Sequence, residues 1–230
     1  MSFLVPKRVD EPELLDEHDA PRPDMERSLR DLRRINRYLG GIGVFRRLLR
    51  RLGGGDASRL SVLDLGTGTS DLLAKTRGKG LKVGLDFKID HLLYGREMRR
   101  EHNGHKNIAL VVGDARNLPF RGGGIDIVTS SHFVHHFTPE ENTAILRESL
   151  RIARRGVAVN DTNRHFVPLL CVRLLAALRL VGRITRSDAP GSILRGYTPD
   201  EARAFATPAG ASRVEIVPMW PFRTGLLLWK

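Results

Sequence analysis

Three aspartates, Asp64, Asp86 and Asp114, each end a short apolar run of the sequence. The first is followed by the glycine-bearing segment 66–68, directly before a helical stretch. Glycines at such a point let the backbone approach a ligand, and the following helix offers free N–H groups and positive dipole. Asp71 stands where a dinucleotide fingerprint has its third glycine. Because the carboxylate of Asp64 would repel a pyrophosphate, the segment favours a ligand with an ammonium group.

The other two aspartates suit an adenosine. A carboxylate at Asp86 can accept both hydroxyls of a ribose. Phe87 follows and either packs on an adenine face or belongs to the core. Asp114 can accept the exocyclic amine of adenine while the N–H of Ala115 meets the ring. A fold that binds only a dinucleotide has no role for this third carboxylate, so the set favours an adenosyl ligand.

Three histidines, His132, His135 and His136, follow the fourth apolar run, and Asp161 ends the fifth. A histidine near its ordinary pKa can remove a proton from a phenol. We expect His132 to be the base, and His135, His136 and Asp161 are the other candidates. Asp161 together with Arg164 would orient the base or bind an acidic substrate. His135 and His136 also suit packing, and alignment of the reactants alone needs no base.

The elements that must position these residues alternate along the chain. Short apolar runs separated by helical stretches predict a parallel sheet with helices on both faces. The five runs are Leu60–Leu65, Leu81–Asp86, Ile108–Asp114, Ile125–Ser130 and Gly156–Asp161. Two closing strands, Arg213–Met219 and Leu226–Trp229, lie close enough for a hairpin. The pattern predicts an α/β fold, a doubly wound Rossmann-like sheet of seven strands with a C-terminal antiparallel hairpin.

Three segments of different composition are expected. Residues 1–24 form a loose acidic arm, and residues 25–59 form two amphipathic helices that cap the cofactor site. Residues 60–230 form the main domain, interrupted at about 163–198 by a helical insertion that begins with one long helix over Phe166–Arg183. This insertion is either a helix packed on the domain or a lid over an apolar pocket that touches a membrane surface. A further helix is expected over Pro199–Ala206.

Composition narrows the class of protein. With 41% hydrophobic and 28% charged residues in a chain of 230, the sequence is neither disordered nor collagenous. The one cysteine, Cys171, excludes an internal disulfide, and no metal ligand set is predicted. No signal peptide or spanning segment is found, so a cytoplasmic protein is expected. The net charge of +12 suits a nucleic-acid partner, but it also suits a coding bias towards arginine.

The stretches VLDLGTGTS, GLD, GDARNLPF and IDIVTSSHFVHHF, in this order and spacing, resemble class I S-adenosylmethionine-dependent methyltransferases over about Leu60–Asp161. The resemblance implies S-adenosylmethionine as cofactor. Its methionine part would be held by Asp64, Gly66, Thr67 and Gly68, its ribose by Asp86, and its adenine by Asp114 and Ala115, with Ser130 or Ser131 lining it. Ser70 replaces the third glycine of the fullest family motif, and Ser131 stands where relatives often have Asn.

The branch of the family follows from smaller features. Motifs of nucleic-acid amino methyltransferases and of pyrimidine C5 methyltransferases are missing. The HHF pattern is similar to small-molecule methyltransferases of the quinone-biosynthesis type, and RRINRYLGG and PGSILRGYTPDEARAF are similar to enzymes acting on polyketide phenols. We therefore expect methyl transfer to a small aromatic or polyketide-like acceptor, to oxygen rather than carbon. An RNA methyltransferase is the alternative, and a nicotinamide-dependent oxidoreductase is a weaker one.

Overall fold

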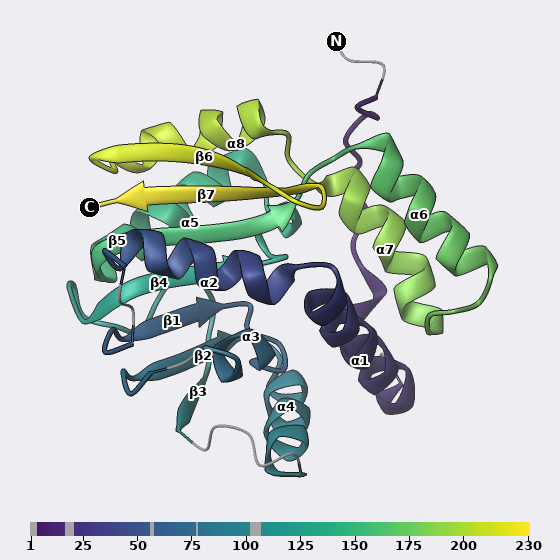
Figure 1. Cartoon of the computed structure of the whole chain (residues 1–230), viewed down its shortest axis with the longest axis horizontal. Helices are drawn as coiled ribbons and strands as arrows, with labels where there is room; N and C mark the ends of the chain where they lie inside the picture. Colours follow the sequence, from purple (N-terminus) through teal and green to yellow (C-terminus); the bar gives the residue numbers. More distant parts are fainter. Residues whose placement is uncertain (1–3, 17–20, 56–57, 77, 102–106) are drawn as a thin grey trace.

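The computed structural model describes residues 4–16, 21–55, 58–76, 78–101 and 107–230 of the chain. Its centre is a seven-stranded sheet in the order β3-β2-β1-β4-β5-β7-β6 (Figure 1). The strands are β1 (Val62–Leu65), β2 (Lys82–Asp86), β3 (Ile108–Val112), β4 (Ile125–Ser131), β5 (Ala153–Thr162), β6 (Arg213–Met219) and β7 (Arg223–Trp229).

Strands β1 to β5 run parallel, and β7 lies antiparallel between β5 and β6. Parallel strands covered on both faces form continuous apolar runs, and every residue of β1 and β2 is buried. The predicted fold class is confirmed. Strand β7 begins at Arg223, before its apolar run, because Arg223, Thr224 and Gly225 pair with residues 160–162 of β5.

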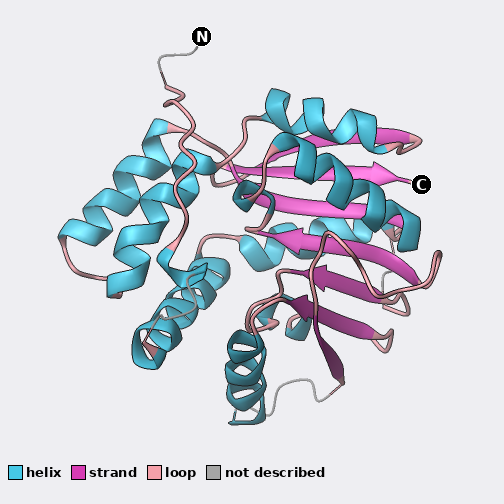
Figure 2. Ribbon diagram, turned by 180° about the vertical axis from the view of Figure 1, so that it is seen from behind, coloured by secondary structure: helices cyan, strands magenta, loops and turns pink. Residues whose placement is uncertain are grey.

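Helices cover both faces of the sheet (Figures 1 and 2). They are α1 (Arg22–Tyr38), α2 (Gly41–Leu52), α3 (Asp71–Ala74), α4 (Ile89–Glu101), α5 (Pro139–Ile152), α6 (Phe166–Ala177), α7 (Arg183–Arg195) and α8 (Pro199–Ala206). Helices α5 and α8 each begin with a threonine capping box, Thr138 with Glu141 and Thr198 with Glu201. In the described part of the chain, no helix is long and apolar enough to cross a membrane.

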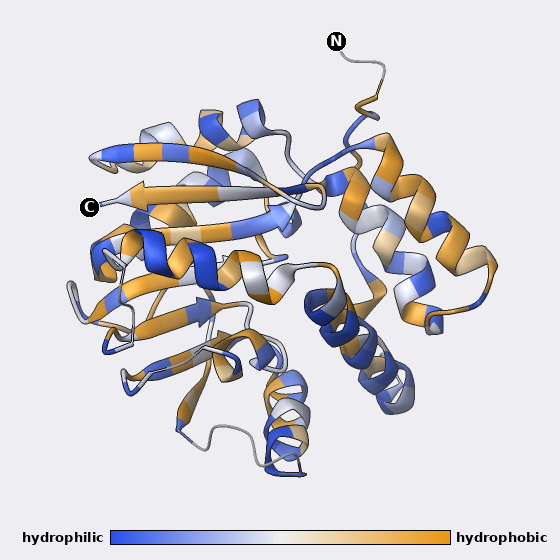
Figure 3. Cartoon of the chain, viewed as in Figure 1, coloured by the Kyte–Doolittle hydropathy of each residue, from blue (hydrophilic) through white to orange (hydrophobic). Residues whose placement is uncertain are grey.

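The core consists of one apolar layer on each face of the sheet. Neighbouring residues of a strand point to opposite faces, so Leu63 packs in the layer under α5 and α8 while Val62 packs under α2 and α3. Figure 3 shows the strands as largely hydrophobic along their length. This two-sided packing makes the sheet a rigid platform for the loops at its edges.

The N-terminal helices differ from the cap predicted over residues 25–59. Helix α2 is part of the core, because Val44, Phe45 and Leu48 are buried against the sheet. Helix α1 instead packs on α7 and α4, where Leu29 lies in one cluster with Ile184 and Tyr94. A capping role is left as a prediction for α1 alone.

The insertion forms two helices instead of the single helix predicted over Phe166–Arg183. Helix α6 ends at Ala177, and Arg179 adopts a φ of 55°. A residue in the left-handed region cannot continue a right-handed helix, so the chain turns back and α7 packs beside α6. Helix α7 thereby contacts α6 and also α1.

The N-terminal arm is more ordered than the loose segment predicted over residues 1–24. The N–H groups of Leu14 and Leu15 donate to the carboxylate of Asp188 on α7, at 3.0 and 2.9 Å. Leu15 is buried against α1 and α7. Residues 1–3 and 17–20 of the predicted arm lie outside the described residues.

Candidate active site

The predicted site residues gather at the carboxyl edge of the sheet, where β1 to β5 end. Strand β1 pairs with β2 on one side and β4 on the other, and open α/β sheets bind ligands at such a reversal of strand order. Asp64 on β1 is therefore flanked by Gly84 on β2 and Thr129 on β4. Asp86 and Ser130 stand on the two neighbouring strands, whereas Asp114 follows the edge strand β3.

The loop after β1 has the backbone shape that a ligand cradle needs. Gly66 and Gly68 have φ values of 61° and 52°, a region that side chains rarely adopt. A Cβ on Gly66 would overlap the ring of Phe133, whereas a Cβ on Gly68 would meet open space. Ser70, in the place of the third glycine, also lies in the left-handed region with a φ of 56°, and its buried Oγ has no described hydrogen-bond partner.

Asp64 lies at the base of this loop and is fully enclosed. Its carboxylate accepts hydrogen bonds from the hydroxyls of Thr67, at 3.0 Å, and Thr129, at 2.8 Å. Burial outweighs these two donors and raises the pKa of Asp64 to about 7. In this arrangement Asp64 ties the glycine loop to β4, and its predicted contact with an ammonium group remains a prediction.

Asp86 links the end of β2 to the same loop. One oxygen accepts the N–H of Gly68 at 2.8 Å, and the other accepts the N–H of Lys88 at 3.0 Å. A carboxylate oxygen has two lone pairs, so each retains one for a ribose hydroxyl. The ring of Phe87, beside it, is 51% exposed, which leaves a face for a stacked base.

Asp114 is more exposed and is held by Arg116 in a two-pronged ion pair, with a shortest distance of 2.7 Å. The hydrogen bonds from Arg116 lower the pKa of Asp114. An adenine amine at this carboxylate would therefore share it with a guanidinium. Ala115 and Ser130 are buried, and Ser131 accepts a hydrogen bond from the Asn160 amide at 3.4 Å.

His132 lies between two side chains of β5 and β7. The Arg223 guanidinium is 2.6 Å from its Nε2, and the Thr162 hydroxyl is 3.1 Å from its Nδ1. Because arginine only donates, Nε2 accepts and the ring proton resides on Nδ1. Burial and the charge of Arg223 lower the pKa of His132 to about 3. With its lone pair engaged, His132 is poorly placed to serve as the predicted base.

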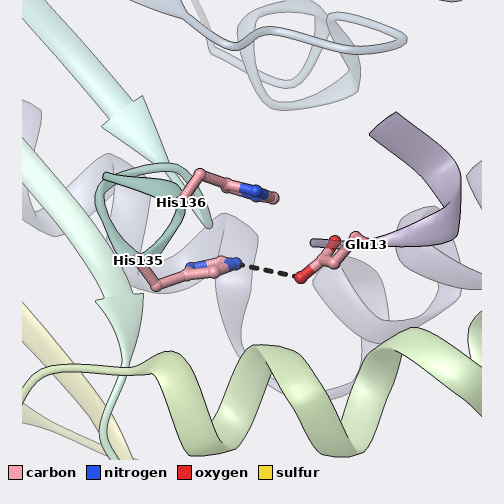
Figure 4. A group of neighbouring side chains, drawn as sticks. All are labelled: Glu13, His135 and His136. Atoms are coloured by element: carbon pink, nitrogen blue, oxygen red, sulfur yellow. Dashed lines mark ion pairs between the residues drawn. The ribbon is translucent and has the colours of Figure 1, made fainter. Parts of the chain in front are cut away.

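His135 lies between two carboxylates, of which Figure 4 shows that of Glu13. Its Nδ1 is 2.7 Å from Asp161 and its Nε2 is 3.5 Å from Glu13 of the arm. Burial opposes the charged ring, but Asp161 and Glu13 together raise the pKa of His135 to about 10. Asp161 also accepts the backbone N–H groups of Phe133 and His135, so it fixes the turn after β4. Asp161 is thus engaged by His135 and by the turn, and its predicted role in catalysis stays a prediction.

His136 faces an opening on the surface. Its Nδ1 lies 2.9 Å from a carboxylate oxygen of Asp16, so the ring donates there. Burial raises the pKa of Asp16, but the hydrogen bond from His136 lowers it. The pKa of Asp16 is therefore below its usual value. His136 lines a cavity of about 250 Å³ together with Asp10, Glu11, Pro12, Asp16 and Arg195. Its Nε2 makes no hydrogen bond with any described residue, so this nitrogen has a lone pair that can accept one.

Glu13, His135 and His136 are close enough to hold a metal ion, with ligand atoms within 4.8 Å of one another (Figure 4). The positive charge at this position comes from the side chain of Arg195. Its guanidinium donates to Glu13 and lies 3.4 Å from Nδ1 of His136. We therefore describe the group as an ion network that ties the arm to α7 and to the turn after β4.

Four residues of this site were not predicted from the sequence: Glu13, Asp16, Arg195 and Arg223. Arg195 and Glu13 are 182 residues apart in the chain, and no local pattern links them. Arg223 stands before the apolar run that marked the last strand. The acidic composition of the arm is the signal for Glu13 and Asp16, and it predicts only a loose arm.

Comparison with known proteins identifies the family model and the relatives that this chain matches. Residues 62–156 match the family model "Methyltransferase domain". The demethylmenaquinone methyltransferase of Corynebacterium kroppenstedtii is 30% identical over 160 residues, 66% of this chain and 64% of the relative. The enzyme of the same name from Lactococcus lactis is 34% identical over 121 residues, 50% and 47% of the two chains. The matched region is thus less than two thirds of the length of either curated relative.

A crystal structure of an S-adenosylmethionine-dependent methyltransferase from Aquifex aeolicus shares the fold. Its TM-score is 0.63 at 18% sequence identity, and the alignment covers 89% of this chain and 97% of that one. Residues 62–156 therefore match a methyltransferase domain, and the sheet that contains them has the fold of the S-adenosylmethionine-dependent methyltransferase from Aquifex aeolicus.

Proposed function

We propose that this chain transfers a methyl group from S-adenosylmethionine to a small aromatic acceptor with an ionisable hydroxyl, of the phenol or quinol type. The observation that carries the proposal is His136, which lines a small cavity at the carboxyl edge of the sheet and is held by Asp16 through its Nδ1. The names of the two curated relatives, both demethylmenaquinone methyltransferases, support a quinol-type acceptor.

The residues present suit the cofactor. The space beside Gly68 admits a ligand against the backbone, and Asp86 keeps lone pairs for two hydroxyls. When bound, S-adenosylmethionine supplies a methyl group already activated on a sulfonium. The chain then has to align the acceptor and exclude water. We assign Asp64, Gly66, Thr67, Gly68, Asp86, Phe87, Asp114, Ala115, Ser130 and Ser131 to binding, as the sequence predicts.

His136 is the base in this proposal. Its Nδ1–H donates to Asp16, which leaves Nε2 to accept the hydroxyl proton of an acceptor. Asp16 fixes the orientation of the ring. His132 and Asp161 become positioning residues, since their polar atoms are engaged by Arg223 and by the turn after β4. Removing the proton makes both the oxygen and the adjacent ring carbon nucleophilic, so transfer to oxygen remains a prediction.

The charge of the cavity argues against an RNA acceptor. Asp10, Glu11 and Asp16 line the opening, and Arg195 is its one arginine. A phosphate backbone would be repelled at this point, although the chain as a whole carries +12. A nicotinamide cofactor would leave Asp114 without a role, so the proposal does not include it.

The test has two stages. Calorimetric titration with S-adenosylhomocysteine, and with NADH as the control, measures binding without any acceptor. Methyl transfer is then measured by mass spectrometry with 1,4-naphthalenediol and, separately, with total tRNA. We expect a methylated diol and unmodified tRNA. Methylated tRNA, or binding of NADH in place of the adenosyl ligand, would overturn the proposal.

A further inference from the structure

Helix α6 exposes an unusually apolar outer face. Of its twelve residues only Leu169 is buried, and the only charged one is Arg173. The exposed large side chains of the helix and the turn after it are Phe166, Val167, Leu170, Leu174, Leu175, Leu178 and Leu180. Leu170, Leu174 and Leu178 are each more than half exposed, at 64%, 58% and 59%. A face of this kind, here called the α6 outer face, normally contacts something other than water.

The α6 outer face is not a core surface left uncovered by the fold. The helix already packs on α7 with its other side, and α7 in turn contacts α1. Figures 1 and 2 show α6 at the periphery, with its far side turned away from the rest of the chain. Figure 3 shows that this helix is hydrophobic around most of its surface. The partner must therefore come from outside the described chain.

The segment of sequence that carries the face has no negatively charged residue. Between Asp161 and Asp188 there are five arginines, of which Arg164 and Arg183 pair with acidic residues elsewhere in the chain. Two of them, Arg173 and Arg179, are exposed among the leucines. Arginines beside an exposed apolar helix match anionic lipid headgroups, which attract positive charge near the bilayer surface. A purely apolar partner would leave these guanidinium groups without matching charge.

Trp220 extends the face. It is 83% exposed, and its ring lies 6.1 Å from that of Phe222. Phe222 stacks at 5.0 Å on His165, the residue that caps the start of α6. Tryptophan is enriched at the boundary between lipid and water, where its apolar ring and polar N–H are both satisfied. The β6–β7 hairpin and α6 thus present one continuous surface.

We infer that the α6 outer face, with Trp220, docks on the surface of an anionic lipid bilayer. A helix of this length is about 18 Å long and lies in the plane of the membrane without crossing it. Helix α6 begins four residues after the end of β5, beside the edge where we propose that the acceptor binds. The role of the docking rests on the proposed function, because an acceptor dissolved in lipid would reach the site from this side.

Vesicle flotation tests the inference without cofactor or acceptor. The full chain is mixed with vesicles of phosphatidylcholine containing about one third phosphatidylglycerol, and with vesicles of phosphatidylcholine alone. We expect flotation with the anionic vesicles, weakened by salt. The triple variant Leu170→Ser/Leu174→Ser/Leu178→Ser and the double variant Arg173→Ser/Arg179→Ser should each lower the partition coefficient at least about tenfold.

Two matched controls lie at the opposite edge of the sheet. Leu81, 56% exposed before β2, and Arg121, exposed before β4, are changed to serine and should leave flotation unchanged. No flotation of the wild type, or equal loss in the controls, would overturn the inference. Light scattering adds a further outcome: a wild-type dimer that the triple leucine variant dissociates would mean that a second copy covers the face. A protein that does not float with vesicles can still bind S-adenosylhomocysteine. The two experiments therefore distinguish failure of the membrane proposal from failure of the proposed function.

Discussion

Nδ1 of His136 lies 2.9 Å from a carboxylate oxygen of Asp16, which joins the turn after β4 to the N-terminal arm. The contact leaves Nε2 of the same ring on the cavity wall. The arm is therefore part of the site and not a tail beside it. Asp16 does for His136 what Asp161 does for His135, since each carboxylate holds one imidazole by its Nδ1.

The first prediction concerns the proposed base. His136→Asn removes the free nitrogen and should lower kcat with a phenolic acceptor by about 10²- to 10⁴-fold, while the Kd for S-adenosylhomocysteine stays unchanged. Asp16→Asn weakens the orientation of the ring and should lower kcat by about tenfold. His165→Asn, on a histidine outside the cavity, is the control. Full activity of the His136 variant would remove His136 from the mechanism.

A second prediction concerns the ribose contact. Asp86→Ala removes the acceptor for two hydroxyls and the anchor for the N–H of Gly68, at a cost of about 1–3 kcal/mol in binding. Calorimetry should therefore show the Kd for S-adenosylhomocysteine rising by about 5- to 150-fold. Asp90→Ala, on the exposed side of α4, should leave the Kd unchanged. Equal affinity of a folded Asp86 variant would contradict the assignment.

The sequence alone predicts the sheet and the loop at the end of β1, because these depend on neighbours in the chain. Apolar runs of strand length, capping boxes such as Thr138 with Glu141, and glycines before a helix are local signals. The closing hairpin is predicted from the short distance between the last two apolar runs, and the structure confirms it, whereas the strand order comes from the structure alone.

The part of the site where we propose that the methyl acceptor binds could not be predicted in the same way. It depends on charge pairs such as Glu13 with Arg195, and on Arg223 reaching His132 across the sheet. These contacts exist only once the arm, α7 and β7 meet at one edge. Sequence reasoning selected His132 because it follows β4 directly, yet the choice among three histidines depends on which lone pair the distant partners leave free.

The ion network around Glu13 carries the third prediction. Glu13 is nearly buried between His135 and Arg195, so Glu13→Gln leaves two cations without their carboxylate. Breaking a buried pair in this way should lower the free energy of unfolding by about 3 kcal/mol. Urea denaturation at neutral pH measures the change. Glu11→Gln, an exposed neighbour on the same arm, should have no effect, and equal stability of both variants would show that the network is not stabilising.

The last prediction follows from the raised pKa of Asp64. That pKa is about 7 in the fold against an ordinary value of 3.8, so the folded state holds a proton that the unfolded chain releases. Its contribution to stability is complete below about pH 4 and is lost as the pH rises through 7, by up to about 4 kcal/mol. Asp64→Asn cannot ionise and removes this loss. Urea midpoints of the two proteins, compared from pH 4 to pH 8, should diverge in favour of the variant as the pH rises. Parallel curves would mean that Asp64 is ionised throughout, with its two threonine hydroxyls sufficient to hold the charge.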